Sequence, residues 1–337
     1  MEPAGLSGPA AGATGRSGPA AGATGPSGPA AGATSALAPL LEATDLAAVR
    51  EAVAAEGRSL DLAGARLHDE GYENLVLRTV DGWILQFPRR EEPDFAREVA
   101  LLRLLAGRMP VPVPEVAWTG ERRRLMAYRA LDGAVFDPAA YAAADQRRRN
   151  RLAASLARFL AVMHTALSAE EIAEVGVPAV DNDAQLALVT DRLDQVPVEL
   201  RARAGDVVEH FQEAWLEPPR PERQVLLHND FHLLNTVLTD GAGEPTGVWD
   251  FSCVQVGPPS LDLRYFARVP AQAPPQLRRD LMQRLADQYA RTGITLDVDG
   301  ARAAMALEDL VDAIDSGDFR RFAPDDGVWA WPGADRA

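Results

Sequence analysis

The chain has 337 residues, and 47% of them are hydrophobic, which allows a sizeable core and about two domains at roughly 100–200 residues each. Its formal net charge of −15 disfavours nucleic acid as a partner, because nucleic acids are bound through basic phosphate contacts, and mildly favours cationic small molecules. The single cysteine, Cys253, excludes an internal disulfide and fits a reducing cytoplasm. No apolar run approaches about 18 uncharged residues and no secretory signal pattern is present, so we expect a cytoplasmic location without a membrane partner.

Residues 1–35 predict a disordered tail. The octapeptide SGPAAGAT occurs at 7–14, 17–24 and 27–34, and such small residues lack the large apolar side chains that offset the entropy of ordering a chain. Folded sequence is expected from about Ala36, with an N-terminal lobe over 36–128 and a C-terminal lobe over 129–337.

The N-terminal lobe is predicted to be rich in strands. One or two short helices are expected over 37–55, followed by short apolar runs at 60–67, 74–80 and 83–88. Asp81-Gly82 lies between the last two runs and is typical of a hairpin, so these runs predict three antiparallel strands. Helical spacing predicts a helix over 93–108, and an extended segment over 111–120 precedes a strand over 124–133.

After Gly133, helical patterns dominate. Apolar periodicity predicts helices over 146–167, 184–196, 204–217, 275–293 and 299–318, and short strands are expected within 223–230, 236–240 and 246–251. The fold class is therefore α+β, in which a small β-rich lobe precedes a larger helical lobe that carries the polar loops.

The stretch LLHNDFHLLNTVL, residues 226–238, places polar side chains in an apolar run. Asp230 follows a predicted strand, Asn235 lies five residues later, and Asp250 ends another strand. If the strands on either side of 239–247 form a hairpin, these three side chains can meet at one end of it. Phosphoryl transfer needs a carboxylate that accepts or orients the proton of a hydroxyl, and hard oxygen donors that hold Mg²⁺ against the phosphates.

These motifs resemble those of a known family. HNDFHLLN followed by WDFS resembles the H-x-D-x-x-x-x-N and D-F/W-G signatures of the aminoglycoside phosphotransferase family, which includes macrolide and choline kinases. Upstream, residues 71–90 resemble the family's glycine loop and the two strands after it, and residues 95–105 its glutamate-bearing helix. The resemblance covers all of the chain but the tail, and implies a bilobal protein-kinase-like fold with a small antiparallel β lobe.

The resemblance also implies roles for single residues. Asp230 would be the catalytic base, and Asn235 and Asp250 would bind Mg²⁺. Glu98 would orient a basic residue that binds phosphate, and Asp262 would anchor the catalytic loop, which His228 braces. The remaining nucleotide-binding positions are the backbone around three residues of the predicted hinge strand: Tyr128, Arg129 and Ala130.

Two positions depart from the family pattern. Gln86 stands where the family usually has Lys or Arg on its third strand, so phosphate neutralisation would fall to Mg²⁺ or to an arginine among Arg78, Arg89 and Arg90. Ser252 replaces the glycine of D-F-G and lacks the freedom of glycine at positive φ.

Three acidic residues share one face of the last predicted helix. Glu308, Asp312 and Asp315 have i, i+4, i+7 spacing. A solvated acidic face is the plain interpretation, and a cation-binding wall for the acceptor is the sharper one, since in the resembling family acceptors bind between the central and C-terminal helices.

The sequence thus predicts a Mg²⁺-dependent kinase that uses ATP or GTP to phosphorylate a hydroxyl of a small molecule, by resemblance an antibiotic of the aminoglycoside, macrolide, nucleoside or peptide type, and so gives resistance. A catalytically silent nucleotide-binding relative is one alternative, prompted by Gln86. A metallohydrolase is another, because His228, Asp230 and His232 alternate as on one face of a strand.

Overall fold

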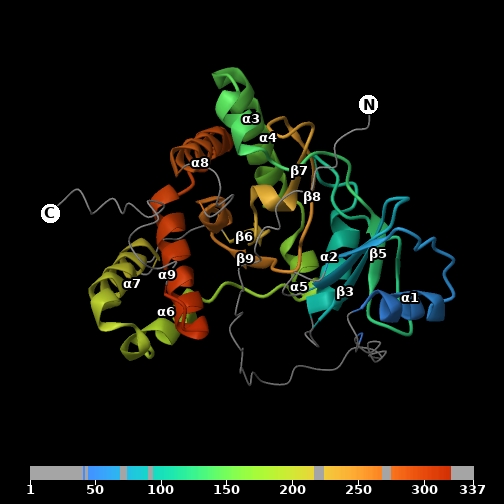
Figure 1. Cartoon of the computed structure of the whole chain (residues 1–337). Coiled ribbons are helices and arrows are strands. Elements are labelled where there is room, and N and C mark those ends of the chain that lie inside the picture. Colours follow the sequence, from blue (N-terminus) through green and yellow to red (C-terminus); the bar gives the residue numbers. More distant parts are fainter. Residues whose placement is uncertain are drawn as a thin grey trace. The chain divides into compact units, whose positions relative to one another are not determined.

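The computed structural model describes residues 41, 45–68, 74–89, 94–215, 224–267 and 275–319 (Figure 1). The predicted tail and Arg90 lie outside these ranges. The chain divides into two compact units, of which the first comprises Met1–Glu92 with Ala117–Ala130 and the second Pro93–Val116 with Leu131–Ala337. The lobe boundary at 128/129 stays a prediction. Within the described ranges, the helices are all too short or too polar to cross a membrane.

An antiparallel sheet forms the body of the first unit. Its spatial order is β1 (Arg66–His68), β2 (Asn74–Arg78), β3 (Trp83–Pro88), β5 (Met126–Arg129), β4 (Trp118–Thr119), and every neighbouring pair is antiparallel. The predicted hairpin is confirmed, because Gly82 has φ +86° and the Thr79 N–H donates to the Trp83 carbonyl over 2.9 Å.

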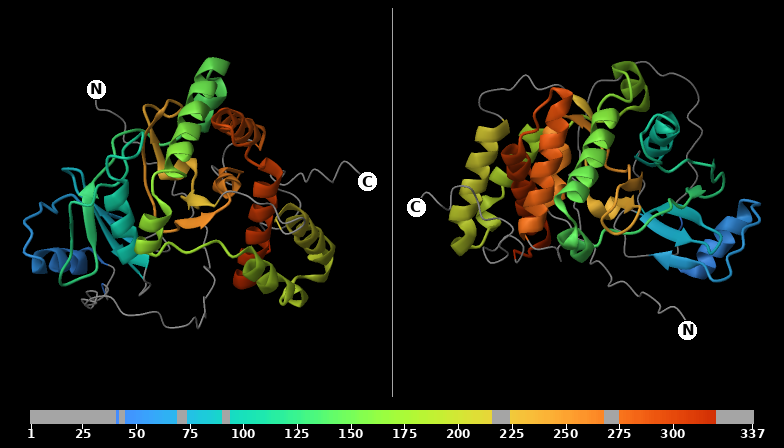
Figure 2. Two further views of the ribbon diagram at one scale, coloured as in Figure 1. Left: turned by 180° about the vertical axis from the view of Figure 1, so that it is seen from behind. Right: turned by 90° about the horizontal axis from the view of Figure 1, so that it is seen from above.

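Helix α1 (Leu46–Ala55) packs on this sheet (Figure 2). It begins at Asp45, whose carboxylate accepts from the Ala48 N–H over 2.8 Å and so satisfies a donor of the first turn. Alternate residues of β2 and β3 point to the helix because strand side chains alternate between faces, and burial of each stabilises the unit by about 1.5–3 kcal/mol. The resulting core contains Val49, Ala52, Val53, Leu75, Leu77, Leu85, Phe87, Leu125 and Ala127.

The second unit is mainly helical. Its α-helices are α2 (Asp94–Leu105), α3 (Pro138–Ala143), α4 (Gln146–Met163), α5 (Ala169–Val175), α6 (Asn182–Thr190), α7 (Arg201–Trp215), α8 (Pro275–Tyr289) and α9 (Val298–Ser316). Helix α4 packs on α8, and α7 packs on α9, as both figures show (Figures 1 and 2). Short 3₁₀ turns are η1 (Leu193–Gln195), η2 (Val198–Leu200), η3 (Leu233–Asn235), η4 (Pro259–Ala267) and η5 (Ala290–Thr292).

Two small antiparallel strand pairs carry the polar loops of this unit. Strand β7 (Thr236–Leu238) pairs antiparallel with β8 (Pro245–Val248), which confirms the hairpin predicted around 239–247. Strand β6 (Val225–Leu227) pairs with β9 (Gln255–Gly257), a strand that local periodicity did not predict. The segments that follow β6 and β8 meet where His228 Nε2 lies 3.1 Å from the Trp249 carbonyl oxygen.

Candidate active site

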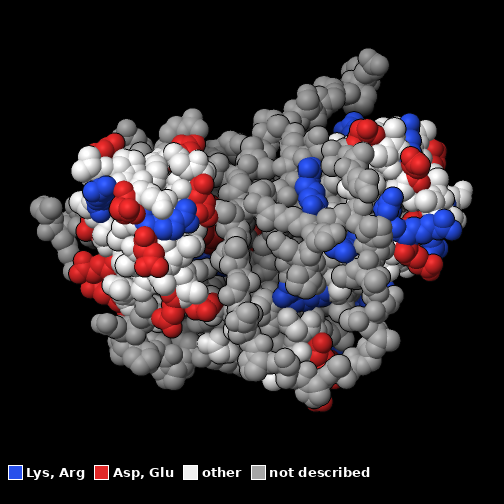
Figure 3. Space-filling model, turned by 90° about the horizontal axis from the view of Figure 1, so that it is seen from below, with Lys and Arg blue, Asp and Glu red and all other residues white. Residues whose placement is uncertain are grey.

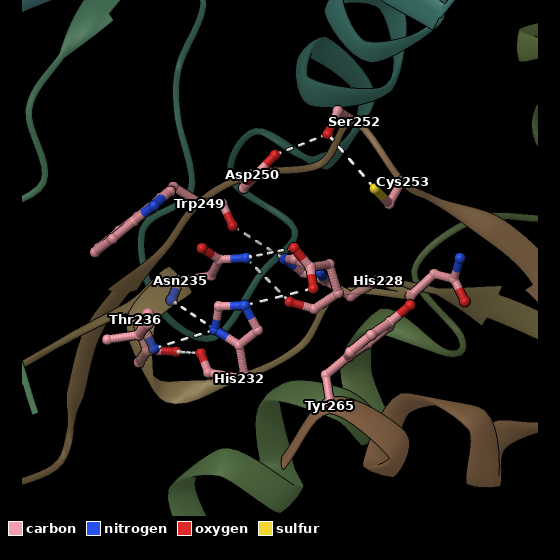
Figure 4. A network of polar contacts seen from close by, with 12 residues as sticks. His228, His232, Asn235, Thr236, Trp249, Asp250, Ser252, Cys253 and Tyr265 are labelled. Atoms are coloured by element: carbon pink, nitrogen blue, oxygen red, sulfur yellow. Dashed lines mark hydrogen bonds and ion pairs between the residues drawn. The ribbon is translucent and has the colours of Figure 1, made fainter. Parts of the chain in front are cut away.

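Asp230 and Asn235 are brought together by the loop that follows β6. The Asn235 side-chain Nδ2 donates to the Asp230 backbone carbonyl over 3.1 Å and to its carboxylate Oδ2 over 3.0 Å (Figure 4). The 3₁₀ turn η3 ends at Asn235 and feeds directly into β7, so the amide is held between a turn and a strand. Because Nδ2 is used in these bonds, the amide presents Oδ1 as its oxygen donor.

The backbone of Trp249 ties Asp250 to the same loop. The Trp249 N–H donates to the Asn235 carbonyl over 3.0 Å, and its carbonyl accepts from His228 Nε2 over 3.1 Å (Figure 4). Asp250 itself has φ +66°, a left-handed conformation that Asp tolerates better than most residues. Its Oδ1 accepts from the Ser252 hydroxyl over 2.8 Å.

Ser252 does not need the freedom of glycine. The positive φ of this turn falls at Asp250, whereas Ser252 is not among the described non-glycine residues with positive φ. The serine hydroxyl instead orients the carboxylate, so the departure from D-F-G leaves the local backbone unstrained at that position.

Asp262, in the first turn of η4, anchors the loop that follows β6 through hydrogen bonds to its backbone. Its fully buried carboxylate accepts from the backbone N–H of His228 over 3.1 Å and of Asn229 over 2.7 Å. His164, at the end of α4, lies with Nε2 2.8 Å from Asp262 Oδ2 and with Nδ1 2.6 Å from the Tyr289 hydroxyl. These bonds fix the backbone just before Asp230, which agrees with the expectation that Asp262 anchors this loop.

Asn229 is held in an unusual conformation. It has φ +62°, and its side chain bonds on both sides: Oδ1 accepts from Arg264 Nη2, and Nδ2 donates to Gln255 Oε1 over 3.1 Å. Arg264 is 3% exposed. Arg264 was not predicted from the sequence. It could have been noticed as a charged residue between the large apolar residues Leu263 and Tyr265, a position that indicates burial with a partner.

His228 braces the loop by packing as well as by hydrogen bonding. Its ring lies 4.7 Å from the Phe251 ring and 5.8 Å from the Phe231 ring, between centroids. Since Nε2 donates to the Trp249 carbonyl and His232 Nδ1 accepts from backbone amides, these nitrogens do not join Asp230 around one metal. Among the described residues, no cluster of three or more His, Cys, Asp or Glu could hold a metal ion.

The donor set of Asn235 and Asp250 fits a hard divalent cation. Asn235 presents Oδ1, and the Ser252 hydroxyl occupies only Oδ1 of Asp250, so both side chains carry oxygens suited to Mg²⁺. Neither side chain brings sulfur or imidazole, the ligands that favour softer metals.

The predicted nucleotide-binding residues of the first unit lie on β3, on β5 and, for Ala130, directly after β5. Gln86 is 6% exposed, and its Oε1 accepts from the Tyr128 hydroxyl over 3.2 Å. Arg129 turns back across the sheet, where its guanidinium lies 3.9 Å from the Trp83 ring centroid and donates to the Asp81 carbonyl over 2.8 Å. The Ala130 N–H donates to the Gly82 carbonyl over 2.8 Å, so this amide already has a partner.

The other predicted site residues differ in burial and in their contacts. Glu98 is buried on α2 of the second unit, Arg78 is exposed at the end of β2, and Arg89 is half-buried. The acidic residues of α9 contact different partners: Glu308 accepts from the Tyr265 hydroxyl and lies 3.5 Å from Arg264 Nη1, whereas Asp315 pairs with Arg192. Asp312 is half-buried between them.

Acidic side chains are prominent on the surface around α6, α7 and α9. Figure 3 shows them gathered on the side of the molecule where α6, α7 and α9 lie in Figure 1. Asp309, which sequence reasoning passed over, is instead buried on α9 at 7% exposure.

Comparison with known proteins identifies the family. Residues 64–294 match the model of the phosphotransferase enzyme family, APH. The chain belongs to this family. It is therefore an enzyme, a small-molecule kinase, and the resemblance that HNDFHLLN and WDFS indicated is confirmed.

Solved structures of phosphotransferases share the fold. The GDP and kanamycin complex of APH(2")-IIIa matches with a TM-score of 0.66 and 17% identity, covering 80% of this chain and 93% of that one. The streptomycin–ATP complex of APH(2")-IIa matches at 0.62 and 15%, covering 85% and 98%. Macrolide 2'-phosphotransferase MphH from Brachybacterium faecium matches at 0.59 and 24%, covering 81% and 94%. The α+β, bilobal kinase-like fold class predicted from the sequence is thereby confirmed.

Proposed function

We propose that this phosphotransferase moves the γ-phosphoryl group of ATP or GTP to a hydroxyl of an antibiotic in a Mg²⁺-dependent reaction, and so gives resistance. The observation that carries the proposal is the pairing of Asn235 Nδ2 with Asp230 Oδ2 over 3.0 Å, together with the bond from the Trp249 N–H to the Asn235 carbonyl, which ties the residue before Asp250 to the same loop. A base and two oxygen donors in this order suit phosphoryl transfer and have no evident use in a structural loop.

In the proposed reaction, Asp230 accepts the proton of the acceptor hydroxyl as its oxygen bonds to the γ-phosphorus. The bond from the γ-phosphorus to the β–γ bridging oxygen breaks, and the nucleoside diphosphate leaves. Asn235 Oδ1 and Asp250 would hold Mg²⁺, which neutralises the charge of the phosphates when bound. The bonds of Asn235 to Asp230 orient the base carboxylate for the hydroxyl.

In this proposal Tyr128 to Ala130 bind the nucleotide base and Gln86 contacts the phosphates. Gln86 brings a donor without charge, so this side of the site depends on Mg²⁺ for neutralisation more than a lysine-bearing site would. One similar phosphotransferase structure is a GDP complex and another contains ATP, and the choice between ATP and GTP for this chain is decided by measuring kcat/KM for each.

An antibiotic acceptor is supported by the same structures, of which one is a kanamycin complex, one a streptomycin complex and one a macrolide 2'-phosphotransferase. Glu308, Asp312 and Asp315 would form the acidic side of the acceptor site and attract a cationic aminoglycoside. Asp312→Asn is expected to raise KM for a polycationic acceptor while kcat stays the same.

The proposal is tested by a mass-shift screen of antibiotic classes with ATP or GTP and Mg²⁺. The expected result is one product that is heavier by a phosphoryl group, and its formation stops when EDTA is added. Asp230→Ala should lower kcat by about 10²–10⁴-fold, the usual contribution of general base catalysis. The control is Asp287→Asn, an exposed change on α8, which should leave kcat unchanged. Transfer at the wild-type rate by Asp230→Ala would contradict the assignment of the base.

A silent nucleotide-binding relative is the second candidate, because Gln86 is uncharged and bonded to Tyr128. The two are separated by Gln86→Lys and Gln86→Arg. A large gain of transfer in these variants, starting from a wild-type protein without turnover, would support the silent relative. Measurable wild-type turnover with a specific acceptor excludes it.

A further inference from the structure

His232 contacts two parts of the catalytic loop, and the reaction proposed above gives it no role. It begins the turn η3, and its Nδ1 accepts from the backbone N–H of Leu234 over 3.1 Å and of Asn235 over 3.2 Å (Figure 4). Its side chain is 14% exposed. The imidazole therefore replaces the Ser, Thr, Asp or Asn that commonly caps the start of a helical turn.

These two contacts determine where the proton of the neutral ring lies. A nitrogen that accepts N–H bonds must present its lone pair, so Nδ1 carries no proton and Nε2 carries it. Nε2 lies 3.4 Å from Asp230 Oδ1, while Asn235 bonds to the other oxygen of this carboxylate. The ring therefore directs a polarised N–H at the side of the base that Asn235 does not hold.

We infer that His232 is a positioning residue for Asp230, an inference that rests on the proposed phosphotransfer. Through Nε2–H it restrains Oδ1 of the base, and through Nδ1 it caps the turn that ends at Asn235, so one ring sets the orientation of both. The 3.4 Å contact is longer than the roughly 2.7–2.9 Å typical of a charge-assisted bond, and such contacts often shorten when substrates bind.

Two substitutions separate the halves of this role. His232→Asn places Oδ1 where Nδ1 lies, so it keeps a good cap but has no atom that reaches Asp230. His232→Gln places an amide nitrogen where Nε2 lies, so it keeps a donor for Asp230 and loses the cap. A merely structural histidine would be replaced best by Asn, whereas a positioning histidine would be replaced best by Gln.

The variants are compared with the wild type using the antibiotic that is phosphorylated fastest in the screen. His232→Asn is expected to keep the wild-type unfolding midpoint and to lower kcat by about 10–100-fold, as loss of a partner that orients a reacting group commonly does. KM for nucleotide and for acceptor should not change. His232→Gln is expected to have the higher kcat of the two and the lower unfolding midpoint.

The inference is overturned if His232→Asn has the wild-type kcat, or if its kcat equals or exceeds that of His232→Gln. A second measurement does not depend on either variant folding: the imidazole ¹⁵N resonances of the wild-type protein should show the Nε2–H tautomer, and a proton on Nδ1 would refute the proposed contacts. Absence of transfer by the wild type would refute the proposed function, while the ¹⁵N spectrum would still test the geometry of His232.

Discussion

Replacing Asp262 by asparagine should destabilise the second unit strongly, although the two side chains have the same shape. The carboxylate is fully buried and accepts from three donors: the Asn229 N–H at Oδ1, and the His228 N–H and His164 Nε2 at Oδ2. An amide has one oxygen, so its NH₂ group must face at least one of these donors.

The expected loss follows from that count. If the amide oxygen takes the place of Oδ2, the NH₂ faces the Asn229 N–H from which a 2.7 Å bond was accepted, and a buried donor left without an acceptor costs about 1–3 kcal/mol. The two remaining bonds change from charge-assisted to neutral and weaken by about 1 kcal/mol each. Asp262→Asn should therefore lower the free energy of unfolding by about 3–5 kcal/mol, or the unfolding midpoint by at least about 6 °C.

The assay is denaturant and thermal unfolding followed by far-UV circular dichroism, in which the helices of the second unit dominate. Asp287→Asn on α8 is the matched control, because that carboxylate is exposed and accepts only a surface bond from Gln283 in the described structure. Its change should stay within about 0.5 kcal/mol. If Asp262→Asn were no less stable than this control, the carboxylate would not be the anchor that the loop depends on.

The remaining predictions concern backbone conformation and pH. Gly133 has φ +154°, and a Cβ there would lie 2.4 Å from the Thr246 Oγ1, so Gly133→Ala should lower the free energy of unfolding by more than about 1 kcal/mol. Gly205 lies in α7 with open space around it, so Gly205→Ala should raise the free energy of unfolding by about 0.5–1 kcal/mol. Unfolding curves that show equal effects for the two variants would contradict the steric argument. The bond from Arg108 lowers the pKa of Glu171 to about 2, so the stability this carboxylate provides is fully present above its unfolded pKa of about 4.3 and is lost as pH falls toward 2. The difference in unfolding free energy between wild type and Glu171→Gln should hence be constant at pH 6–8 and shrink below about pH 4; a difference that grows on acidification would show the opposite sign.

Local patterns were sufficient for most elements of the fold. The Asp81-Gly82 turn between two apolar runs predicted β2 and β3, and helical spacing predicted α2, α4, α7, α8 and α9 to within a few residues. The pairing of β6 with β9 was not predictable in this way, because it joins segments about thirty residues apart and each strand has only three residues. Such pairing is decided by tertiary contacts and not by the local pattern.

In the candidate site, too, local spacing predicted some features, and tertiary contacts decided others. The spacing of Asp230, Asn235 and Asp250 predicted that the three side chains can meet at one end of a hairpin. In the structure Asn235 bonds to Asp230, β7 pairs with β8, and the Trp249 N–H bonds to the Asn235 carbonyl, while the roles of the three residues stay predictions. The resemblance implied Asp262 as an anchor of the loop, but its partner His164 was not predicted, because the two residues lie 98 positions apart and a lone histidine on an apolar helix face does not indicate which residue it contacts. The spacing of the acidic residues on α9 likewise did not predict that Asp315 forms an ion pair with Arg192.

Hydrogen bonds around the candidate site explain why two non-glycine residues, Asn229 and Asp250, can keep positive φ angles. Such conformations are unfavourable by about 1–3 kcal/mol each and persist where surrounding contacts determine them. Asn229 is bonded through its backbone to Asp262 and through its side chain to Arg264, while Asp250 follows a residue whose N–H and C=O are both bonded to the 228–235 loop. The strain thus lies at Asn229, next to the proposed base, and at Asp250, and the buried charges of η4 stabilise the conformation of Asn229. Loss of the Asp262 or Arg264 charge is therefore expected to alter the backbone conformation next to Asp230 as well as to lower stability.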